Sequence, residues 1–292
     1  MKLYAPKYYK EFKCIADKCT HSCCVGWEIG VDEETLCGYK NLPEGERDEI
    51  LSHIDEGVIR LSADGRCPFL DKNGLCRIIS RHGEEYTSVI CREHPRFYNN
   101  VGDRAEVGIG ASCEEAARII LSADSYDEFF EIGEREEGAS EEFDPTEDRK
   151  FIYSMLKERS KTFRERIDRI KRKYSLPEEL LSPKSVSERL STLEYMREEN
   201  RALLSDVSAS NEKDSQLRER FFAYLVYRHL TGACSLENLR ARLCLCITLL
   251  MVFESLLTTN IDKIFAARLV SEEMEYSEDN IDSLIFDFEC EL

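Results

Sequence analysis

The feature that most restricts the fold of this chain is the crowding of cysteine into its first part. Nine of the thirteen cysteines lie between Cys14 and Cys113, in a chain of 292 residues. The chain begins MKLYAPKYYKEFKC, which has lysines and tyrosines where the apolar core of a signal peptide would lie. We therefore expect a cytoplasmic location, where thiols stay reduced and bind metal, perform chemistry or fill cores.

Eight of these cysteines form a predicted ligand set. The first four follow the pattern C-x4-C-x3-C-C, and the others come at widening intervals. The predicted ligands are Cys14, Cys19, Cys23, Cys24, Cys67, Cys76, Cys91 and Cys113. Four thiolates complete a zinc site or hold one cubane cluster, so eight permit one site with spare cysteines or two full sites. Adjacent side chains project differently, so Cys23 and Cys24 are not expected to share a metal, and His21 is a candidate replacement ligand.

The intervals between these cysteines favour an iron–sulfur cluster of the 4Fe-4S type, with zinc as the alternative. Zinc ribbons and fingers present two compact cysteine pairs, whereas the later intervals here are long and irregular. The first three cysteines are close to the plant-ferredoxin spacing C-x4-C-x2-C. The remaining five are expected to be core or surface thiols, since they lie outside this constellation. These are Cys37, Cys234, Cys244, Cys246 and Cys290.

Three further residues are predicted to bind a cofactor. Arg92 and Arg96 flank His94 and Pro95 beside a predicted ligand, where guanidinium groups can offset thiolate charge or clamp an anionic group. Ordinary structural ion pairs are the alternative for both arginines. Trp27 follows the first cysteine group and offers an aromatic face for a cation. No catalytic residue is assigned.

The pattern of glycine, charge and apolar residues predicts a mainly α protein with two parts. Residues 1–124 are expected to form a cysteine-rich, loop-rich, metal-binding domain. Residues 125–148 are acidic and predict a linker, and residues 149–292 predict a helical domain. Helices are expected near 147–173, 184–206, 214–232, 236–258 and 278–290. Ser112 and Glu115 resemble a capping box at the start of another helix.

The charge and the apolar runs exclude two kinds of partner. A formal net charge of −18 repels phosphate backbones, so no nucleic acid is expected, and the basic stretch 163–174 predicts a solvated helix face. The apolar run at 243–253 is too short for a membrane helix, which needs about 20 residues, and predicts a buried helix.

The ordered motifs resemble a known family. FKCIADKCTHSCCVGWEIGVDEET, CPFLDKNGLCRI, GEEY with CREHPRF, and SCEEAARIIL are similar to the cysteine-cluster signature of the flagellin lysine-N-methylase family. The similarity extends to FFAYLVYRHL and EEMEYSEDNID in the second half, so it covers most of the chain. Two positions depart from the family: His94 replaces an aromatic residue and Glu114 replaces proline. Neither removes a predicted ligand.

The resemblance implies an enzyme that uses S-adenosylmethionine to methylate lysine side chains of flagellin and is associated with an iron–sulfur cluster. A related group of smaller proteins with this signature is described only as zinc- or iron-chelating. The alternative is therefore a noncatalytic metal-binding or redox-sensing protein with a helical partner-binding domain. The segment EVGIGASCEEAAR contains Gly108 and Gly110 but lacks the third glycine of a dinucleotide-binding turn, so these glycines predict a turn ahead of Cys113.

Overall fold

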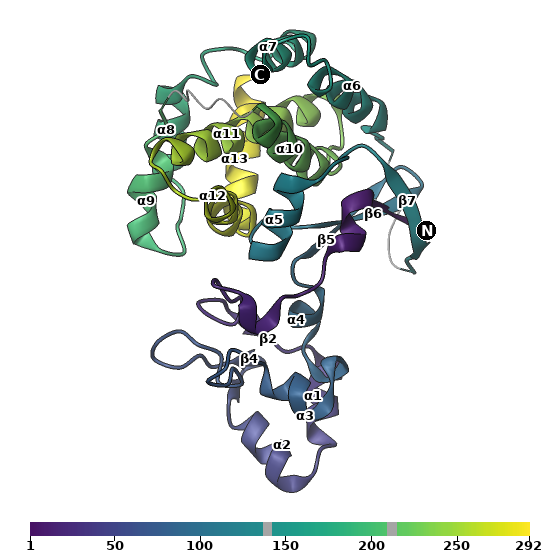
Figure 1. Ribbon diagram of the computed structural model, residues 1–292, viewed down its shortest axis with the longest axis vertical. Coiled ribbons are helices and arrows are strands. Elements are labelled where there is room, and N and C mark those ends of the chain that lie inside the picture. Colours follow the sequence, from purple (N-terminus) through teal and green to yellow (C-terminus); the bar gives the residue numbers. More distant parts are fainter. Residues whose placement is uncertain (137–141, 209–214) are drawn as a thin grey trace. The chain divides into compact units, whose positions relative to one another are not determined.

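The computed structural model describes residues 1–136, 142–208 and 215–292. Thirteen α-helices and two small sheets occur among these residues, which confirms the prediction of a mainly α protein (Figure 1). The chain forms two compact units. The helical unit comprises Met1–Phe12, Phe97–Ser112 and Ala116–Leu292, and the cysteine unit comprises Lys13–Arg96 with Cys113–Glu115.

This division differs from the predicted domains at both ends of the cysteine-rich region. Strand β1 (Lys2–Pro6) pairs in parallel with β6 (Arg104–Ile109) and antiparallel with β7 (Phe129–Glu134). With β5 (Arg96–Val101) they form one sheet in the order β5-β6-β1-β7. The N-terminus and residues 97–112 therefore join the helical unit, because backbone pairing holds them there. The predicted linker contains β7 and the start of α6, and its residues 137–141 lie outside the described residues.

The second half contains more helices than predicted, and the predicted helices 147–173 and 184–206 are each divided into two. They are α6 (Thr146–Leu156), α7 (Phe163–Lys173), α8 (Pro183–Ser191), α9 (Glu198–Ser205), α10 (Ser215–Leu225), α11 (Leu236–Thr258), α12 (Lys263–Val270) and α13 (Glu278–Glu291). Two π-helical turns follow α10 and α12, at η4 (Val226–Leu230) and η5 (Ser271–Glu275), and a 3-10 turn, η1 (Lys7–Glu11), follows β1. The predicted helix 147–173 is divided because Thr162 caps α7 through a capping box with Glu165.

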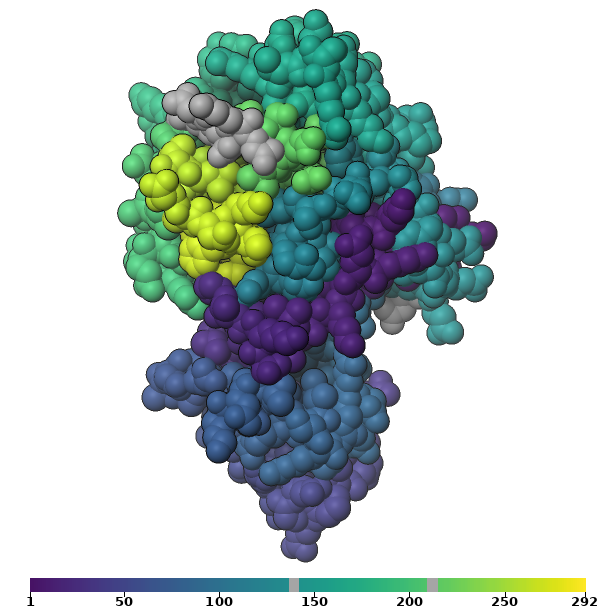
Figure 2. All heavy atoms as spheres, in the orientation of Figure 1, coloured from purple at the N-terminus to yellow at the C-terminus, as the bar shows by residue number. Residues whose placement is uncertain are grey.

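Helix α11 forms the centre of the helical unit. Among the described residues, α11 is the one helix that is long and apolar enough to cross a membrane by length and composition. However, 72% of its most apolar stretch is buried inside the protein. Its cysteines, Cys244 and Cys246, are fully buried, as expected for core thiols. The last helix, α13, has one face in the core, with Phe288 buried, and its other face exposes Phe286 at 65%. The C-terminal part of the chain is the yellow area on the visible face in Figure 2.

The basic helix α7 is only partly the solvated face that the sequence predicts. Ile167 and Ile170 are buried as the apolar side of this helix. Arg166 is also buried, and its guanidinium lies 2.7 Å from the buried carboxylate of Glu219 on α10. A pattern of charged residues alone does not distinguish this inward arginine from its exposed neighbours.

The cysteine unit contains short elements around a small core. Its helices are α1 (Glu33–Lys40), α2 (Glu44–Leu51), α3 (Arg77–His82) and α4 (Val89–Glu93), with 3-10 turns η2 (Ala16–Lys18) and η3 (Glu84–Tyr86). Strands β2 (Ile29–Gly30), β3 (Ile54–Asp55) and β4 (Val58–Ile59) form a sheet in the order β2-β4-β3. The buried core consists of Ile29, Tyr39, Ile50, Ile59, Cys67, Phe69 and Ile78. Loops make up much of the remainder, as the sequence predicts.

Helix α5 (Glu114–Ser122) runs from the cysteine unit into the helical unit. The predicted capping box at its start is wrong, because the buried hydroxyl of Ser112 has no hydrogen-bond partner among the described residues. The helix begins at Glu114, one residue later than a cap at Ser112 requires, so Cys113 directly precedes it.

Candidate metal centre

All eight predicted ligands lie in the cysteine unit. None of the thirteen cysteines, all within the described part of the chain, is in a disulfide. Cys37 also belongs to this unit but is exposed on α1, and Cys234 and Cys290 are exposed elsewhere. The fold therefore gathers thiols that the sequence spreads from Cys14 to Cys113.

Four of the eight form a group that we term the inner set: Cys67 lies in the small core, Cys24 and Cys76 pack against this core, and Cys91 lies on α4. The amide of Cys67 donates a 2.8 Å hydrogen bond to the carbonyl of Cys24, and Cys24 and Cys76 pack against the core that contains Cys67. Burial of the sulfur raises the pKa of Cys67, Cys76 and Cys91, and a thiolate at Cys24 raises all three further. These four sulfur atoms thus influence one another electrostatically.

The buried side chain of Tyr39 lies beside the inner set. It is 1% exposed, and its hydroxyl has no hydrogen-bond partner among the described residues. Burial raises the pKa of this hydroxyl, and the charges of Cys91, Cys76 and Cys67 raise it further. A buried hydroxyl without a partner costs about 1 to 3 kcal/mol, so an acceptor supplied to the Tyr39 hydroxyl by a bound group would stabilise the unit.

Local hydrogen bonds hold the inner cysteines in place. Asp32 caps α1 by accepting from the amide of Thr35 at 2.9 Å, and it also accepts from the amide of Val89 at 2.9 Å. This second bond ties α1 to α4, which carries Cys91, and Ser88 donates to the sulfur of Cys91 at 3.3 Å. Burial opposes ionisation of Asp32, but these hydrogen bonds lower its pKa to about 2.

A tight turn positions Cys76 opposite Leu70, which lies before the turn. Asp71 accepts from the amides of Asn73 at 2.7 Å and Leu75 at 2.9 Å, which closes the turn. Cys76 then pairs across it with Leu70. The sequence DKNG, with its Asp and Gly, is typical of such a turn.

The other four predicted ligands, Cys14, Cys19, Cys23 and Cys113, are termed the outer set. Glu114, next to Cys113, accepts from the amides of Thr20 at 2.8 Å and His21 at 3.1 Å and from the sulfur of Cys19 at 3.7 Å. These bonds hold the loop that carries Cys19 beside Cys113. Burial, with the nearby charges of Glu114 and Cys113, raises the pKa of Cys19 to about 11.

The adjacent residues Cys23 and Cys24 connect the two sets. The thiol of Cys23 hydrogen bonds to Cys24, which lowers the pKa of Cys24 to about 6 and raises that of Cys23. The two sulfur atoms therefore interact, and the expectation that Cys23 and Cys24 do not share a metal stays a prediction. Their other neighbours differ, however: Cys23 is influenced by Cys113 and Cys14, whereas Cys24 influences the rest of the inner set.

The described residues contain no group of three or more histidine, cysteine or acidic side chains that converges on a single metal ion. Ligands of one zinc ion all lie about 2.0 to 2.3 Å from a common point. A cubane cluster offers each thiolate a separate iron atom, so it demands less convergence. The thiol-only donor sets and the unpartnered Tyr39 hydroxyl fit such a group in chemical type.

The three predicted cofactor-binding residues also lie in the cysteine unit. Arg92 donates to the backbone carbonyls of Glu85, at 3.2 Å, and Thr87. Arg96 donates to the carbonyl of Arg92 at 3.0 Å. The ring of Trp27 lies 6.3 Å from that of His94. These contacts support the loop around Cys91. They do not test whether the three residues bind a cofactor, which stays a prediction.

His21 faces a carboxylate in this structure. Its Nδ1 lies 3.5 Å from the carboxylate of Glu114 and 2.9 Å from the hydroxyl of Thr20. Glu114 is one of the two positions at which the sequence departs from the family that it resembles, and here its carboxylate holds the loop that carries Thr20 and His21.

A buried polar cluster in the helical unit was not predicted as a site. The carboxylate of Glu275 accepts from the hydroxyl of Tyr224 at 2.7 Å, and it lies 2.7 Å from Nε2 of His229 and 3.4 Å from Nε of Arg228. Burial opposes ionisation of Glu275, but Arg228 and His229 lower its pKa to about 2. The cluster joins the two π-helical turns, and π-helical turns recur at functional sites. The residues of this cluster lie in FFAYLVYRHL and EEMEYSEDNID, the two segments of the second half that resemble the family, and the fold brings these segments together.

The glycines considered for a dinucleotide site have a packing role. Gly108 lies in β6, not in a turn, and a Cβ at this position would meet the ring of Phe97 at 2.3 Å and that of Tyr227 at 2.8 Å. The amide of Ala111, after the strand, donates to Tyr224 at 3.0 Å. The expected turn ahead of Cys113 is present at Ala111 and Ser112, but Gly108 lies in the strand before it.

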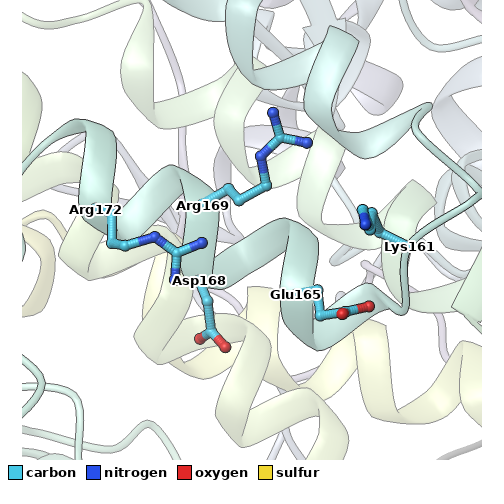
Figure 3. Close-up of a pocket in the computed structure, with 5 residues that line it drawn as sticks. All are labelled: Lys161, Glu165, Asp168, Arg169 and Arg172. Carbon is cyan, nitrogen blue, oxygen red and sulfur yellow. The ribbon is translucent and has the colours of Figure 1, made fainter.

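A surface hollow of about 250 Å³ lies along α7 (Figure 3). It is lined by Lys161, Glu165, Asp168, Arg169 and Arg172. Arg169 is paired with Glu158, so part of this positive charge is neutralised. Small-molecule sites are mostly apolar with a few polar groups, whereas this lining is entirely charged. It therefore does not resemble a donor pocket.

The fold and the site define a mainly helical protein that gathers eight predicted metal ligands in one small unit. Over 127 residues, 40% of the chain, it is 28% identical to the flagellar biosynthetic protein FliU of Salmonella muenchen, covering 75% of that protein. It is equally similar over 127 residues to the lysine-N-methylases of Salmonella typhimurium and Salmonella choleraesuis, covering 32% of each. The match thus spans about a third of these two methylases. These relatives confirm the resemblance to the flagellin lysine-N-methylase family. No family model and no solved structure matches the chain.

Proposed function

We propose that this protein is a cytoplasmic enzyme that transfers methyl groups from S-adenosylmethionine to lysine side chains of flagellin, and that its cysteine unit binds an iron–sulfur cluster. The similarity to proteins named lysine-N-methylase carries the first part of the proposal. The eight thiols gathered in one unit, with the unpartnered Tyr39 hydroxyl beside four of them, support the second.

Methyl transfer to lysine sets clear demands on the site. The amine must be neutral and in line with the sulfonium carbon of the donor, so the site must remove a proton and exclude water. Desolvation favours the neutral amine, and aromatic faces or carboxylates near it orient the cationic donor. We propose that Trp27, Arg92 and Arg96 contact the donor, since Trp27 offers a face for the sulfonium and the arginines can bind its carboxylate.

In the bound form, the predicted thiolates would hold the cluster, which can shape the cysteine unit or respond to redox state. The residues of this chain then act as ligands, and Tyr39 donates a hydrogen bond to an acceptor among them. Zinc is the alternative occupant of the same thiols. Purification without oxygen, followed by elemental analysis and visible absorption, tests the choice: we expect iron, acid-labile sulfide and a brown colour. A colourless, zinc-loaded protein would contradict the cluster.

Activity is tested by incubating the anaerobically purified protein with flagellin from the same bacterium and radiolabelled S-adenosylmethionine. We expect label in methyl-lysine after hydrolysis of flagellin. The matched control is flagellin whose lysines are blocked by prior reductive methylation. No transfer from protein with a complete cluster would contradict the enzyme and favour the alternative, a noncatalytic metal-binding or redox-sensing protein.

A further inference from the structure

Strand β7 is one edge of the four-stranded sheet in the helical unit (Figure 1). In the order β5-β6-β1-β7, it pairs with β1 on one side and with no strand on the other among the described residues. Directly after β7, the backbones of Arg135 and Met1 exchange hydrogen bonds of 2.7 and 2.8 Å. Neighbouring residues of an antiparallel strand direct their backbone groups to opposite sides. The amide and carbonyl of Glu134 therefore face away from β1, on the outer edge of the sheet.

Exposure distinguishes β7 from β5, the strand at the other edge. The last four residues of β7, 131–134, are all exposed, and Ile132 among them is 38% exposed. None of the residues of β5 is exposed. Strand β5 also lies against η4, where Asn99 donates to the carbonyl of Arg228 at 3.1 Å. Because unpaired backbone groups on an exposed edge can pair with a further strand, β7 is the edge that can accept an extended segment.

The charge of this edge restricts which segment it accepts. Residues 127–136, which contain β7, include five acidic residues and one basic residue. On the inner side, β1 already carries a lysine that pairs with this strand: Nζ of Lys2 lies 2.8 Å from the carboxylate of Glu131. Glu134 is exposed and forms no ion pair among the residues that the structure describes. The outer edge thus offers a carboxylate without a cationic partner.

We propose that the outer edge of β7 binds an extended, lysine-bearing segment of the substrate protein as an added strand. This inference rests on the proposed methylation of lysine and adds how the substrate chain docks. Opposite charges on paired strands attract one another, whereas like charges repel. The glutamates of β7 therefore favour a strand with lysines and disfavour the same strand of a second copy of this chain.

Strand addition also suits an enzyme that modifies side chains. The hydrogen bonds of an added strand come from its backbone, so they hold the segment without engaging its side chains. Successive side chains of a strand point to opposite faces of the sheet. Lysines can therefore project from the bound segment while its backbone is fixed, and segments of different sequence can dock at the same edge.

The docking mode is tested with a fluorescein-labelled peptide in which lysine alternates with threonine. Its affinity for the whole chain is measured by fluorescence anisotropy. A matched peptide carries N-methyl groups on its backbone nitrogens, which removes the hydrogen-bond donors and leaves the charge unchanged. We expect the N-methylated peptide to bind at least about tenfold more weakly, because two or more hydrogen bonds are lost. Hydrogen exchange of the β7 amides, read by mass spectrometry, should slow when the unmodified peptide binds.

Charge variants of the protein locate the docking surface. Glu134→Lys should weaken binding of the unmodified peptide about tenfold, because it replaces an attraction by a repulsion. The control is Glu178→Lys, which changes the net charge equally at an exposed position between α7 and α8 and should leave the affinity unchanged. Far-ultraviolet circular dichroism checks that both variants fold, and the comparison of the two peptides does not depend on either variant.

Three results would overturn docking at this edge: equal affinity of the two peptides, unchanged exchange of the β7 amides, or equal weakening by the two charge variants. The methyl-transfer assay with flagellin separates this inference from the proposed enzyme. Methyl transfer by the wild type together with any of the three results would leave the enzyme intact and refute the docking mode. Peptide binding at β7 without methyl transfer would support the docking surface and contradict the enzyme.

Discussion

Replacing Glu275 by glutamine should destabilise the helical unit severely. This side chain is fully buried and is surrounded by Tyr224, Arg228 and His229 at 2.7 to 3.4 Å. Glutamine preserves the volume and removes the charge. Arg228 would then keep a buried positive charge without its principal counter-charge.

The size of the effect follows from the pKa of Glu275. Its value of about 2, against an ordinary value of 4.5, corresponds to about 3 kcal/mol in favour of the charged form, at about 1.4 kcal/mol per unit. Breaking a buried ion pair by removing one partner typically costs about 3 to 5 kcal/mol, in agreement with this figure. Urea unfolding followed by far-ultraviolet circular dichroism measures the loss. The control is Glu178→Gln, because Glu178 is exposed, and its stability should change by less than about 0.5 kcal/mol.

The pH dependence gives the same reasoning a second test. The folded-state pKa of Glu275 is depressed, so its stabilisation is complete above about pH 4.5 and is lost as the pH falls towards 2. Burial also lowers the pKa of His229, which therefore destabilises the fold as the pH falls below 6.5. The glutamine variant should show a flatter stability curve than the wild type between pH 4.5 and 2. A loss under about 1 kcal/mol at neutral pH, with an unchanged acid limb, would refute the role given to this carboxylate.

Four further substitutions test other parts of the structure. Cys67→Ser should lose metal and local structure together, whereas Cys244→Ser, in the core of α11, should keep its metal; equal metal content in the two variants would disprove the ligand assignment. Asp32→Ala removes the bond to the amide of Val89, so hydrogen exchange of that amide, read by mass spectrometry, should become faster, and an unchanged rate would show that α4 is held by other contacts. Thr162→Ala removes the cap of α7 and should cost about 1 kcal/mol in urea unfolding, and no measurable cost would mean that water replaces it.

Sequence patterns predicted the longest helix of this chain but missed shorter local features. The apolar spacing from Leu236 to Thr258 predicted α11 at its observed bounds, because a long apolar helix needs no distant information. The break before α7 was missed, although Thr162 and Glu165 have the capping-box spacing, because no glycine or proline marks it. Helix α12 was missed as well, since it is only eight residues long.

Long-range features could not be predicted in the same way. The pairing of Leu3 with Ala105 decides where the units divide, and nothing in the local sequence of either residue indicates its partner. The grouping of Cys24 with Cys67 likewise depends on how loops fold back on one another. Spacing therefore identified the eight candidate ligands, whereas their division into sets required the fold.

The cysteine unit is inserted between two segments that pair in the sheet of the helical unit. Strand β1 ends before Lys13, and the chain returns after Arg96 to form β6, its parallel partner. In an unstructured state this insertion is a flexible loop of roughly 80 residues, whose closure costs roughly 4 kcal/mol of chain entropy by the (3/2)RT ln n relation. Folding of this insertion shortens the effective loop, so the folding of the cysteine unit and the pairing of β1 with β6 favour each other. A metal bound as we propose would therefore also favour the closure of the sheet in the other unit.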